Sequence, residues 1–432
     1  MRIATGGATP CLPAIVTMNI ADSVLRASSK ILFKQVRKRL SEQQLPIRVR
    51  LWSGEEYSPS GPVKTEVALR RPRALWALAN PSLGNLARAY VEEDIDLVGD
   101  TRSMLEVGEL LCRDSAVGHA RKWGLMSRWH HSKSADKKAI AYHYDVSNEF
   151  YQLWLDSRLV YSCAYFRHDS DTLDAAQEQK LDHICRKLML EPEERFLDIG
   201  CGWGALLLRA AQQYRTRATG VTLSRLQYEY VSAQIKDRGL EDRCEVRLMD
   251  YRDIPDTEQY DKIASVGMFE HVGVPKLPDY FSKIYRLLKP GGLAMNHGIT
   301  SMGINDVDAG PDTDAFIQGY VFPEGELTHV SRVIEAMAEQ RLECCDAECL
   351  RPHYAKTLWH WVGRLEAHRR EAVALVGEKN YRIWQIYMAG SAWAFERGWL
   401  SIYQLLAARP DRSGKLCYPL TREHMYVAKP HP

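Results

Sequence analysis

The stretch from Arg195 to Gly204 constrains the fold of this chain of 432 residues more than any other. The run Arg195–Ile199 is typical of a buried strand, glycines follow at positions 200, 202 and 204, and Ala205–Leu208 begins an apolar helix. Glycine lets the backbone turn tightly and approach a ligand that a Cβ would repel. The helix that follows would offer free N–H groups at its start. The stretch predicts a strand, a glycine turn and a helix, which nucleotide sites and ordinary loops share.

The strand after the glycine turn argues against a dinucleotide. In a dinucleotide-binding unit this strand ends in an acidic residue that holds the ribose hydroxyls. Here the predicted strand Arg217–Val221 runs into Thr222–Gln227, which contains hydroxyls and an amide but no acid. The pattern therefore disfavours NAD.

The next predicted strand, Cys244–Met249, does end in an acid, Asp250. This carboxylate could accept a hydrogen bond from an adenine amino group, while Tyr251 or Arg252 packs on the ring. Readout of an adenosine without a pyrophosphate loop resembles a Rossmann-like S-adenosylmethionine methyltransferase.

Further strands end in residues that carry chemistry. The runs Ile263–Gly267 and Leu293–Asn296 lead to Glu270 and His297, and helical patterns alternate with the strands. This alternation predicts an α/β fold with a doubly wound parallel sheet, whose ligands lie beyond the carboxyl ends of the strands. The helical, tryptophan-rich segment 315–408 is expected to cover the sheet and roof an apolar pocket. Five predicted strands end close to Gly200, Thr222, Asp250, Glu270 and His297.

The composition is that of a soluble globular protein, with 45% hydrophobic and 26% charged residues. A formal net charge of +2 is too small to imply nucleic acid binding. No apolar run reaches the length of a membrane span, and we expect no signal peptide at the N-terminus. The ten cysteines favour reduced thiols in a cytoplasm. We expect no metal site, because the cluster Cys344, Cys345 and Cys349 lacks a second pair at zinc spacing.

The pattern divides the chain into three parts. Residues 1–115 predict an α+β accessory domain, with strands at Ile47–Trp52 and Val63–Leu69. Residues 116–140 are a basic linker, and residues 141–432 form the catalytic domain. The linker's lysines and arginines are interleaved with Trp123 and Trp129. It is either a solvated connector or an interfacial segment that meets anionic lipid headgroups.

From about Thr65 to the C-terminal helices the chain resembles a cyclopropane fatty acid synthase. The segments that carry this resemblance are YHYDVSNEFY, YSCAYF, LDIGCGWG, VTLSRLQ, DYRD, SVGMFEHVG, LLKPGG, NHGIT and YVFPEGEL. It implies a Rossmann-like class I methyltransferase with a lipid-associated N-terminal domain. The implied reaction transfers a methylene from S-adenosylmethionine to the cis double bond of a phospholipid acyl chain. It also implies a homodimer, peripheral on the inner face of the membrane.

The resemblance assigns two groups of residues. One binds a bicarbonate ion near the transferred methyl: Cys163, Glu270, His297, Ile299 through its backbone, and Tyr320. The other binds S-adenosylmethionine: Tyr144, Tyr161, Ser162, Asp198, Gly200, Gly202, Gly204, Thr222, Leu223, Ser224, Gln227, Asp250, Tyr251 and Arg252.

The chemistry of alkene methylation supports the first group. Methylating an alkene creates a carbocation, and a base must remove a proton from the new methyl in a pocket that excludes water. A small anion held by His297 and a tyrosine could serve, while an aromatic face such as Phe269 or Tyr320 stabilises the cation.

Two alternatives remain open, and two positions depart from the family, Ser391 and Thr328, the second standing where a proline is expected. The chain could instead be a methyl-branching or N-methylating enzyme of the same fold, or a lipid-binding protein without catalysis. Ser391 stands where the family has a cysteine considered as a nucleophile, which speaks against covalent catalysis there.

Overall fold

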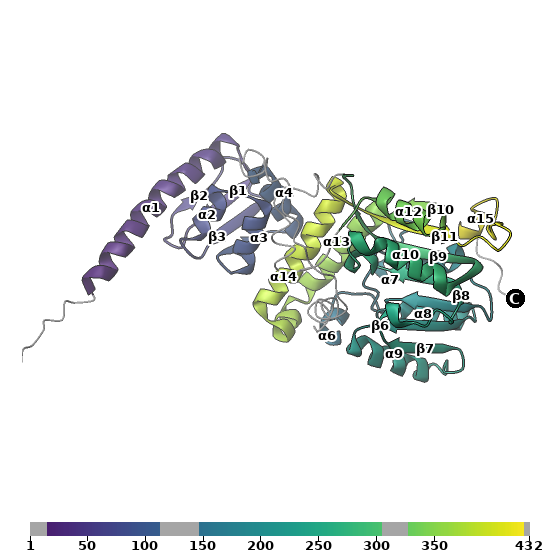
Figure 1. The fold of residues 1–432 in the computed structure, drawn as a ribbon. Coiled ribbons are helices and arrows are strands. Elements are labelled where there is room, and N and C mark those ends of the chain that lie inside the picture. The colour runs from purple at the N-terminus through teal and green to yellow at the C-terminus, as the bar shows by residue number, and fades with distance from the viewer. Residues whose placement is uncertain (1–14, 113–146, 305–326, 427–432) are drawn as a thin grey trace, which may run out of the picture. The chain divides into compact units, whose positions relative to one another are not determined.

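The computed structural model describes residues 15–112, 147–304 and 327–426, with side chains from Ser29 onward (Figure 1). The chain divides into two compact units, Met1–Gly118 and His119–Pro432. The predicted linker at 116–140 lies outside the described residues, so its role stays a prediction. No helix among the described residues has both the length and the apolar character needed to cross a membrane.

The first unit is a small α+β domain built on a four-stranded sheet in the order β2-β1-β3-β4. β1 and β3 pair in parallel, and the edge strands β2 and β4 pair antiparallel to their neighbours. Alternate residues of β3 are buried, as the alternating sequence predicts. The elements are α1 (Ile15–Glu42), β1 (Ile47–Arg50), β2 (Glu56–Tyr57), β3 (Thr65–Leu69), α2 (Ala74–Ala79), α3 (Leu83–Val91), β4 (Ile95–Val98) and α4 (Thr101–Cys112).

The second unit is built on a seven-stranded sheet in the order β10-β11-β9-β8-β5-β6-β7. The five strands from β5 to β9 pair in parallel, which confirms the predicted doubly wound α/β fold. The strands are β5 (Arg195–Ile199), β6 (Arg217–Thr222), β7 (Cys244–Leu248), β8 (Tyr260–Val266), β9 (Leu288–Ser301), β10 (Glu343–Cys349) and β11 (Leu400–Ala408).

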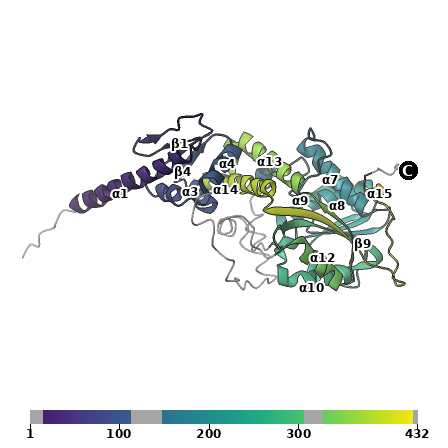
Figure 2. The same ribbon diagram turned by 90° about the horizontal axis from the view of Figure 1, so that it is seen from above.

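Helices cover both faces of this sheet (Figure 2). On one face, Leu181, Leu207 and Val231 of α7, α8 and α9 belong to one buried cluster. On the other, Ile284 and Val333 of α10 and α12 belong to a second cluster. The helices are α6 (Asn148–Gln152), α7 (Leu173–Lys187), α8 (Ala205–Gln213), α9 (Arg225–Asp237), α10 (Leu277–Leu287), α12 (Val330–Glu339), α13 (Arg351–Ala367), α14 (Arg369–Arg397) and α15 (Glu423–Tyr426), with 3₁₀ turns η2 (Tyr251–Asp253), η3 (Phe269–His271) and η4 (Val274–Lys276).

The expectation that segment 315–408 is entirely helical is wrong. Residues Glu343–Cys349 and Leu400–Ala408 are strands, and β11 pairs antiparallel with β9 from Leu400–Ser301 to Ala408–Leu293. The run at 400–408 is mostly apolar on both faces, so its periodicity does not distinguish a helix from a buried strand. Pairing with the free edge of β9 decides the outcome, because it satisfies the backbone groups of both strands.

A buried ion network fixes α7 against β10. The Lys187 side chain is fully buried, and its Nζ lies 3.0 Å from Asp346 Oδ2 and 2.6 Å from Glu348 Oε2. His183 Nε2 lies 2.7 Å from the same Glu348 oxygen, and Arg422 Nε donates to Asp346 Oδ1 at 2.7 Å. Because these carboxylates and His183 satisfy the buried ammonium and its partners, Lys187 has a structural role.

Candidate active site

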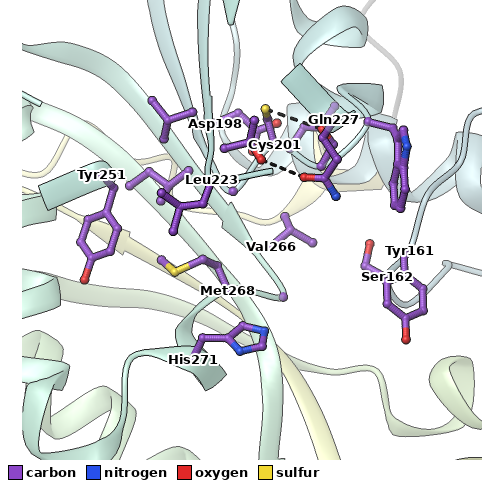
Figure 3. A pocket seen from close by; sticks show the side chains of 18 of the residues that line it. Tyr161, Ser162, Asp198, Cys201, Leu223, Gln227, Tyr251, Val266, Met268 and His271 are labelled. Atoms are coloured by element: carbon purple, nitrogen blue, oxygen red, sulfur yellow. Dashed lines mark hydrogen bonds between the residues drawn. The ribbon is translucent and has the colours of Figure 1, made fainter. Parts of the chain in front are cut away.

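A pocket of about 380 Å³ lies at the carboxyl ends of the parallel strands (Figure 3). Its lining includes residues from the ends of β5, β6, β7 and β8 and from the segment Leu159–Ser162. In the close view Tyr161 and Ser162 lie on one side, and Val266, Met268 and His271 face them. The predicted cofactor residues that line it are Tyr161, Ser162, Asp198, Gly200, Gly202, Thr222, Leu223, Gln227, Asp250, Tyr251 and Arg252. Tyr144 lies outside the described residues.

The three glycines of the turn have different tasks. All have positive φ, at 75°, 54° and 80° for Gly200, Gly202 and Gly204, a region that side-chain-bearing residues rarely adopt. A Cβ on Gly202, which lines the pocket, would meet nothing within 4 Å, so the open space beside it is available to a ligand. A Cβ on Gly204 would stand 2.9 Å from Val231 of α9. Gly204 does not line the pocket and instead allows close helix packing.

The loop after β6 is held by its own hydroxyls. Thr222 Oγ1 donates to Gln227 Oε1 at 2.8 Å and accepts from Ser224 N at 3.2 Å. Ser224 Oγ accepts from Gln227 N and thereby caps α9. Ser224 is not among the residues that line the pocket. Its hydroxyl fixes the loop, and the bond from Thr222 orients the Gln227 amide at the pocket wall.

Asp250 and Arg252 form a tight local pair. Asp250 Oδ1 accepts from Arg252 N at 2.9 Å and Nε at 2.8 Å, and Oδ2 accepts from Nη2 at 2.6 Å. The Arg252 guanidinium also lies 5.6 Å from the centre of the Tyr251 ring. This pairing orients the Asp250 carboxylate at the edge of the pocket, where the sequence predicts adenine recognition.

Two buried ionisable groups form part of the pocket wall. Lys180 of α7 and Asp198 of β5 both line the pocket and are each 2% exposed. Burial raises the pKa of Asp198 to about 7 and lowers that of Lys180 to about 8. The sequence interpretation missed Lys180. Its signal was its position on the buried face of α7, among Leu173, Ala176 and Ile184.

The interpretation also missed His271 and Met268. Both line the pocket and follow the end of β8. The rule that ligands lie beyond strand ends would have found them, because Gly267 ends the apolar run.

The described members of the predicted bicarbonate group, Cys163, Glu270, His297 and Ile299, do not line the pocket, although neighbours of Cys163 and Glu270 in sequence do. Ile299 N donates to Glu270 Oε1 at 2.8 Å, which joins two of the predicted members. A Cβ on Gly298 would lie 2.0 Å from the Phe269 ring and 3.1 Å from Glu270 Oε1, so only glycine allows this approach. Glu270 Oε2 is buried without a hydrogen-bond partner among the described residues. Burial raises the pKa of Glu270 to about 7.

His297 also has a buried ring nitrogen without a hydrogen-bond partner among the described residues. Its Nδ1 lies 3.2 Å from Gln404 Nε2, an amide nitrogen that can only donate, while its Nε2 has no partner among the described residues. Burial lowers the pKa of His297 well below its usual range. The lowered pKa favours the neutral ring.

Cys163 is not joined to Glu270, His297 or Ile299 by any contact among the described residues. The Cys163 thiol contacts the carbonyl of Leu350 at 3.9 Å, and burial raises its pKa far above the ordinary range. The charges of Lys180 and Glu348 act on both Cys163 and His297, so these two share neighbours. Tyr320 lies outside the described residues.

An aromatic cluster packs behind Tyr161. Its ring centre lies 5.5 Å from Trp154, 5.3 Å from Trp361 of α13 and 6.2 Å from Trp384 of α14. The tryptophan-rich helices therefore contact Tyr161, which lines the pocket, while their own residues are not among those that line it. Ser391 lies within α14.

The comparisons place the chain in a family. The family model described as mycolic acid cyclopropane synthetase matches residues 131–405. The chain belongs to this family of S-adenosylmethionine-dependent methyltransferases. It is therefore a methyltransferase of the cyclopropane synthase family, as its motifs indicate.

Several relatives support this placement. A probable fatty acid methyltransferase of Pseudomonas putida is 43% identical over 392 residues, which cover 91% of this chain and 99% of the relative. The cyclopropane synthase MmaA2 from Mycobacterium tuberculosis is similar in structure, with a TM-score of 0.60 and 34% identity over 63% of this chain and 98% of that one. The mycolic acid cyclopropane synthase CmaA1 complexed with SAH and CTAB also gives a TM-score of 0.60, at 33% identity and with coverage of 63% and 98%.

Replacement of Glu270 with Gln should remove a pH dependence of stability. Because the pKa of Glu270 is raised from 4.5 to about 7, the folded state keeps a proton that the unfolded state has released between these values. The stability that this group contributes is complete below about pH 4.5 and is lost as the pH rises through about 7. Relative to Glu270→Gln, the wild type should lose on the order of 3 kcal/mol across this window.

Urea unfolding at a series of pH values measures this difference. Glu335→Gln is the control, because that side chain is 58% exposed on α12. A stability difference between the wild type and Glu270→Gln that is the same at every pH would contradict the assignment.

Proposed function

We propose that this enzyme transfers a methylene from S-adenosylmethionine to the cis double bond of an unsaturated phospholipid acyl chain and forms a cyclopropane ring. The observation that carries this proposal is the pair of buried atoms without partners, Glu270 Oε2 and His297 Nε2. A simple methyl transfer to an amine has no need of such a pair. Removal of a proton from a carbocation in a dry site does need a held base.

The pocket suits S-adenosylmethionine in size and chemistry. Its volume is about 380 Å³, its glycine turn leaves open space beside Gly202, and polar groups stand at both ends. The adenine would lie near Asp250 and Tyr251, and the amino acid end near Ser162 and Asp198. When bound, the cofactor supplies an electrophilic methyl on a sulfonium.

The two buried atoms also fit a bicarbonate ion. Neutral His297 would donate from Nε2, and Glu270, with its pKa near 7, would donate or accept at Oε2 according to its protonation. Ile299 N already donates to the other oxygen of Glu270 and so fixes its orientation. Bicarbonate in this position would supply a weak base. With Gln404 Nε2 donating to Nδ1, the His297 ring would carry its proton on Nε2 and could donate it to an anion.

The remaining residues would protect the cation. Phe269 packs against the backbone of Gly298 and holds an aromatic ring beside Glu270. Tyr161, backed by Trp361 and Trp384, closes the pocket on another side. Such apolar walls exclude water that would otherwise capture the cation.

The acyl chain implies contact with a bilayer, and we include peripheral binding to anionic membrane in the proposal. Its support is the sequence of residues 119–138, where Arg121, Lys122, Arg128, Lys133, Lys137 and Lys138 are interleaved with tryptophans. Each basic residue near an anionic surface contributes about 1 kcal/mol. A homodimer remains part of the proposal on the family resemblance.

The reaction can be tested on vesicles of anionic phospholipid with cis-unsaturated chains. With S-adenosylmethionine present, acyl chains should gain the mass of one CH₂ group and then resist mild hydrogenation, because a cyclopropane has no double bond. The protein should also sediment with these vesicles, and less so in high salt. Unchanged lipid masses in the presence of active cofactor binding would contradict the proposal.

A methyl-branching reaction on the same chains is the second candidate. The relative from Pseudomonas putida, a probable fatty acid methyltransferase, favours it. Both reactions begin with methyl transfer to the double bond and differ in which proton is lost. A branched product that keeps a double bond would gain two hydrogens in the hydrogenation step, and this outcome would replace cyclopropanation by branching.

His297→Ala should slow turnover by about 10²- to 10⁴-fold, the effect of losing a positioned acid or base. Its affinity for S-adenosylhomocysteine should stay nearly unchanged, because His297 does not line the cofactor pocket. Depleting bicarbonate from the buffer should slow the wild type but have little further effect on the variant. His368→Ala, at the exposed junction of α13 and α14, serves as the control.

Two results would count against this role. Full turnover by His297→Ala would exclude the residue from proton removal. If the fold-losses of turnover from the substitution and from bicarbonate depletion multiply, His297 and bicarbonate have independent functions.

A further inference from the structure

Helix α7 carries two buried lysines that are satisfied in different ways. Lys187 is bonded to Asp346 and Glu348 by short contacts. Lys180, two turns earlier, is 2% exposed and donates from Nζ to Ser162 Oγ at 2.8 Å. It forms no ion pair with any residue in the described ranges. An ammonium has three donors, so Lys180 has donor capacity left where it lines the pocket.

The two carboxylates that act electrostatically on Lys180 do not accept a hydrogen bond from it. Asp156 and Asp198 act on Lys180 electrostatically, and both are 2% exposed. Asp156 Oδ1 accepts from Val160 N at 2.9 Å, and its Oδ2 accepts from Arg158 N at 2.9 Å. Asp198 interacts with the backbone of Leu207. The wall thus presents an ammonium and a separate carboxyl group, a pattern complementary to an amino acid zwitterion.

The topology indicates which end of the cofactor would meet this wall. Asp250 follows β7, Thr222 ends β6, and Asp198 lies on β5, and these three strands are consecutive neighbours in the sheet. Neighbouring strands lie about 4.8 Å apart, so the ends of β7 and β5 are separated by about 10 Å. A cofactor whose adenine bound at Asp250 would extend past Thr222, and Lys180, Ser162 and Asp198 would then hold its amino acid arm.

We propose that Lys180, together with Ser162, binds the α-carboxylate of S-adenosylmethionine. This inference rests on the proposed assignment of the pocket to that cofactor. Ser162 accepts a bond from Lys180 and can donate its own hydroxyl proton to the same carboxylate. Asp198 is placed to receive the α-ammonium. Lys180 is thus a binding residue that orients the methionine arm, and with it the sulfonium methyl, against the substrate side.

Calorimetric titration with two ligands tests this role. The first ligand is S-adenosylhomocysteine, and the second is its decarboxylated analogue, which keeps the adenosine, sulfur and amine. Lys180→Met should weaken binding of the first by about 10- to 100-fold, the range expected for a charge-assisted hydrogen bond. Binding of the second should change by less than about 3-fold, because it offers Lys180 no carboxylate. Lys180→Arg should restore part of the loss.

Lys187→Met is the matched control, since it removes a buried lysine of the same helix that faces protein carboxylates. It should not change the ratio of the two affinities. Equal losses of both ligands in Lys180→Met would overturn the proposal and leave Lys180 a structural residue. A wild type that binds both ligands equally would also overturn it, whether or not the variant folds. A wild type that binds neither would refute the assignment of the pocket itself.

Discussion

The site depends on one geometric constraint: parallel strands end at a common edge of their sheet. β5 to β9 run in the same direction, so segments far apart in sequence meet there. This brings the glycine turn, Thr222 and Asp250 into one pocket, with Glu270 and His297 beside it. Thr222 ends β6, Asp250 and Glu270 follow β7 and β8, and His297 lies within β9 beside the end of β8.

A second feature is that some buried ionisable groups are fully paired and others are not. Lys187, Asp346 and Glu348 neutralise one another and stabilise the contact of α7 with β10. Lys180, Asp198, Glu270 and His297 are as deeply buried but have fewer partners. Leaving such groups underpaired costs stability. Under the proposed function, the bound cofactor and a bicarbonate ion would complete the hydrogen bonds of these groups and so offset this cost.

Much of this arrangement follows from sequence, and the exceptions have physical causes. The strands β5 to β9 and the residues at their ends could be predicted, because apolar runs and glycine turns are local signals. β10 and β11 were missed because their pairing with β9 is a long-range contact that local periodicity does not encode. A motif identifies its members but not their tasks: Ser224 caps a helix and Gly204 packs against Val231. Lys180 went unrecognised because its contact with Ser162 exists only after α7 has packed.

The central claim is that the turn at Gly202 brings the backbone against S-adenosylmethionine. The most direct measurement is the affinity of S-adenosylhomocysteine for Gly202→Val, compared with Gly239→Val. Both glycines have positive φ, at 54° and 61°, and open space around the Cβ position, but Gly239 follows α9 and does not line the pocket. The comparison therefore separates backbone strain from obstruction of the ligand. The account predicts that folded Gly202→Val loses binding while Gly239→Val keeps it; unchanged affinity in folded Gly202→Val would contradict the account.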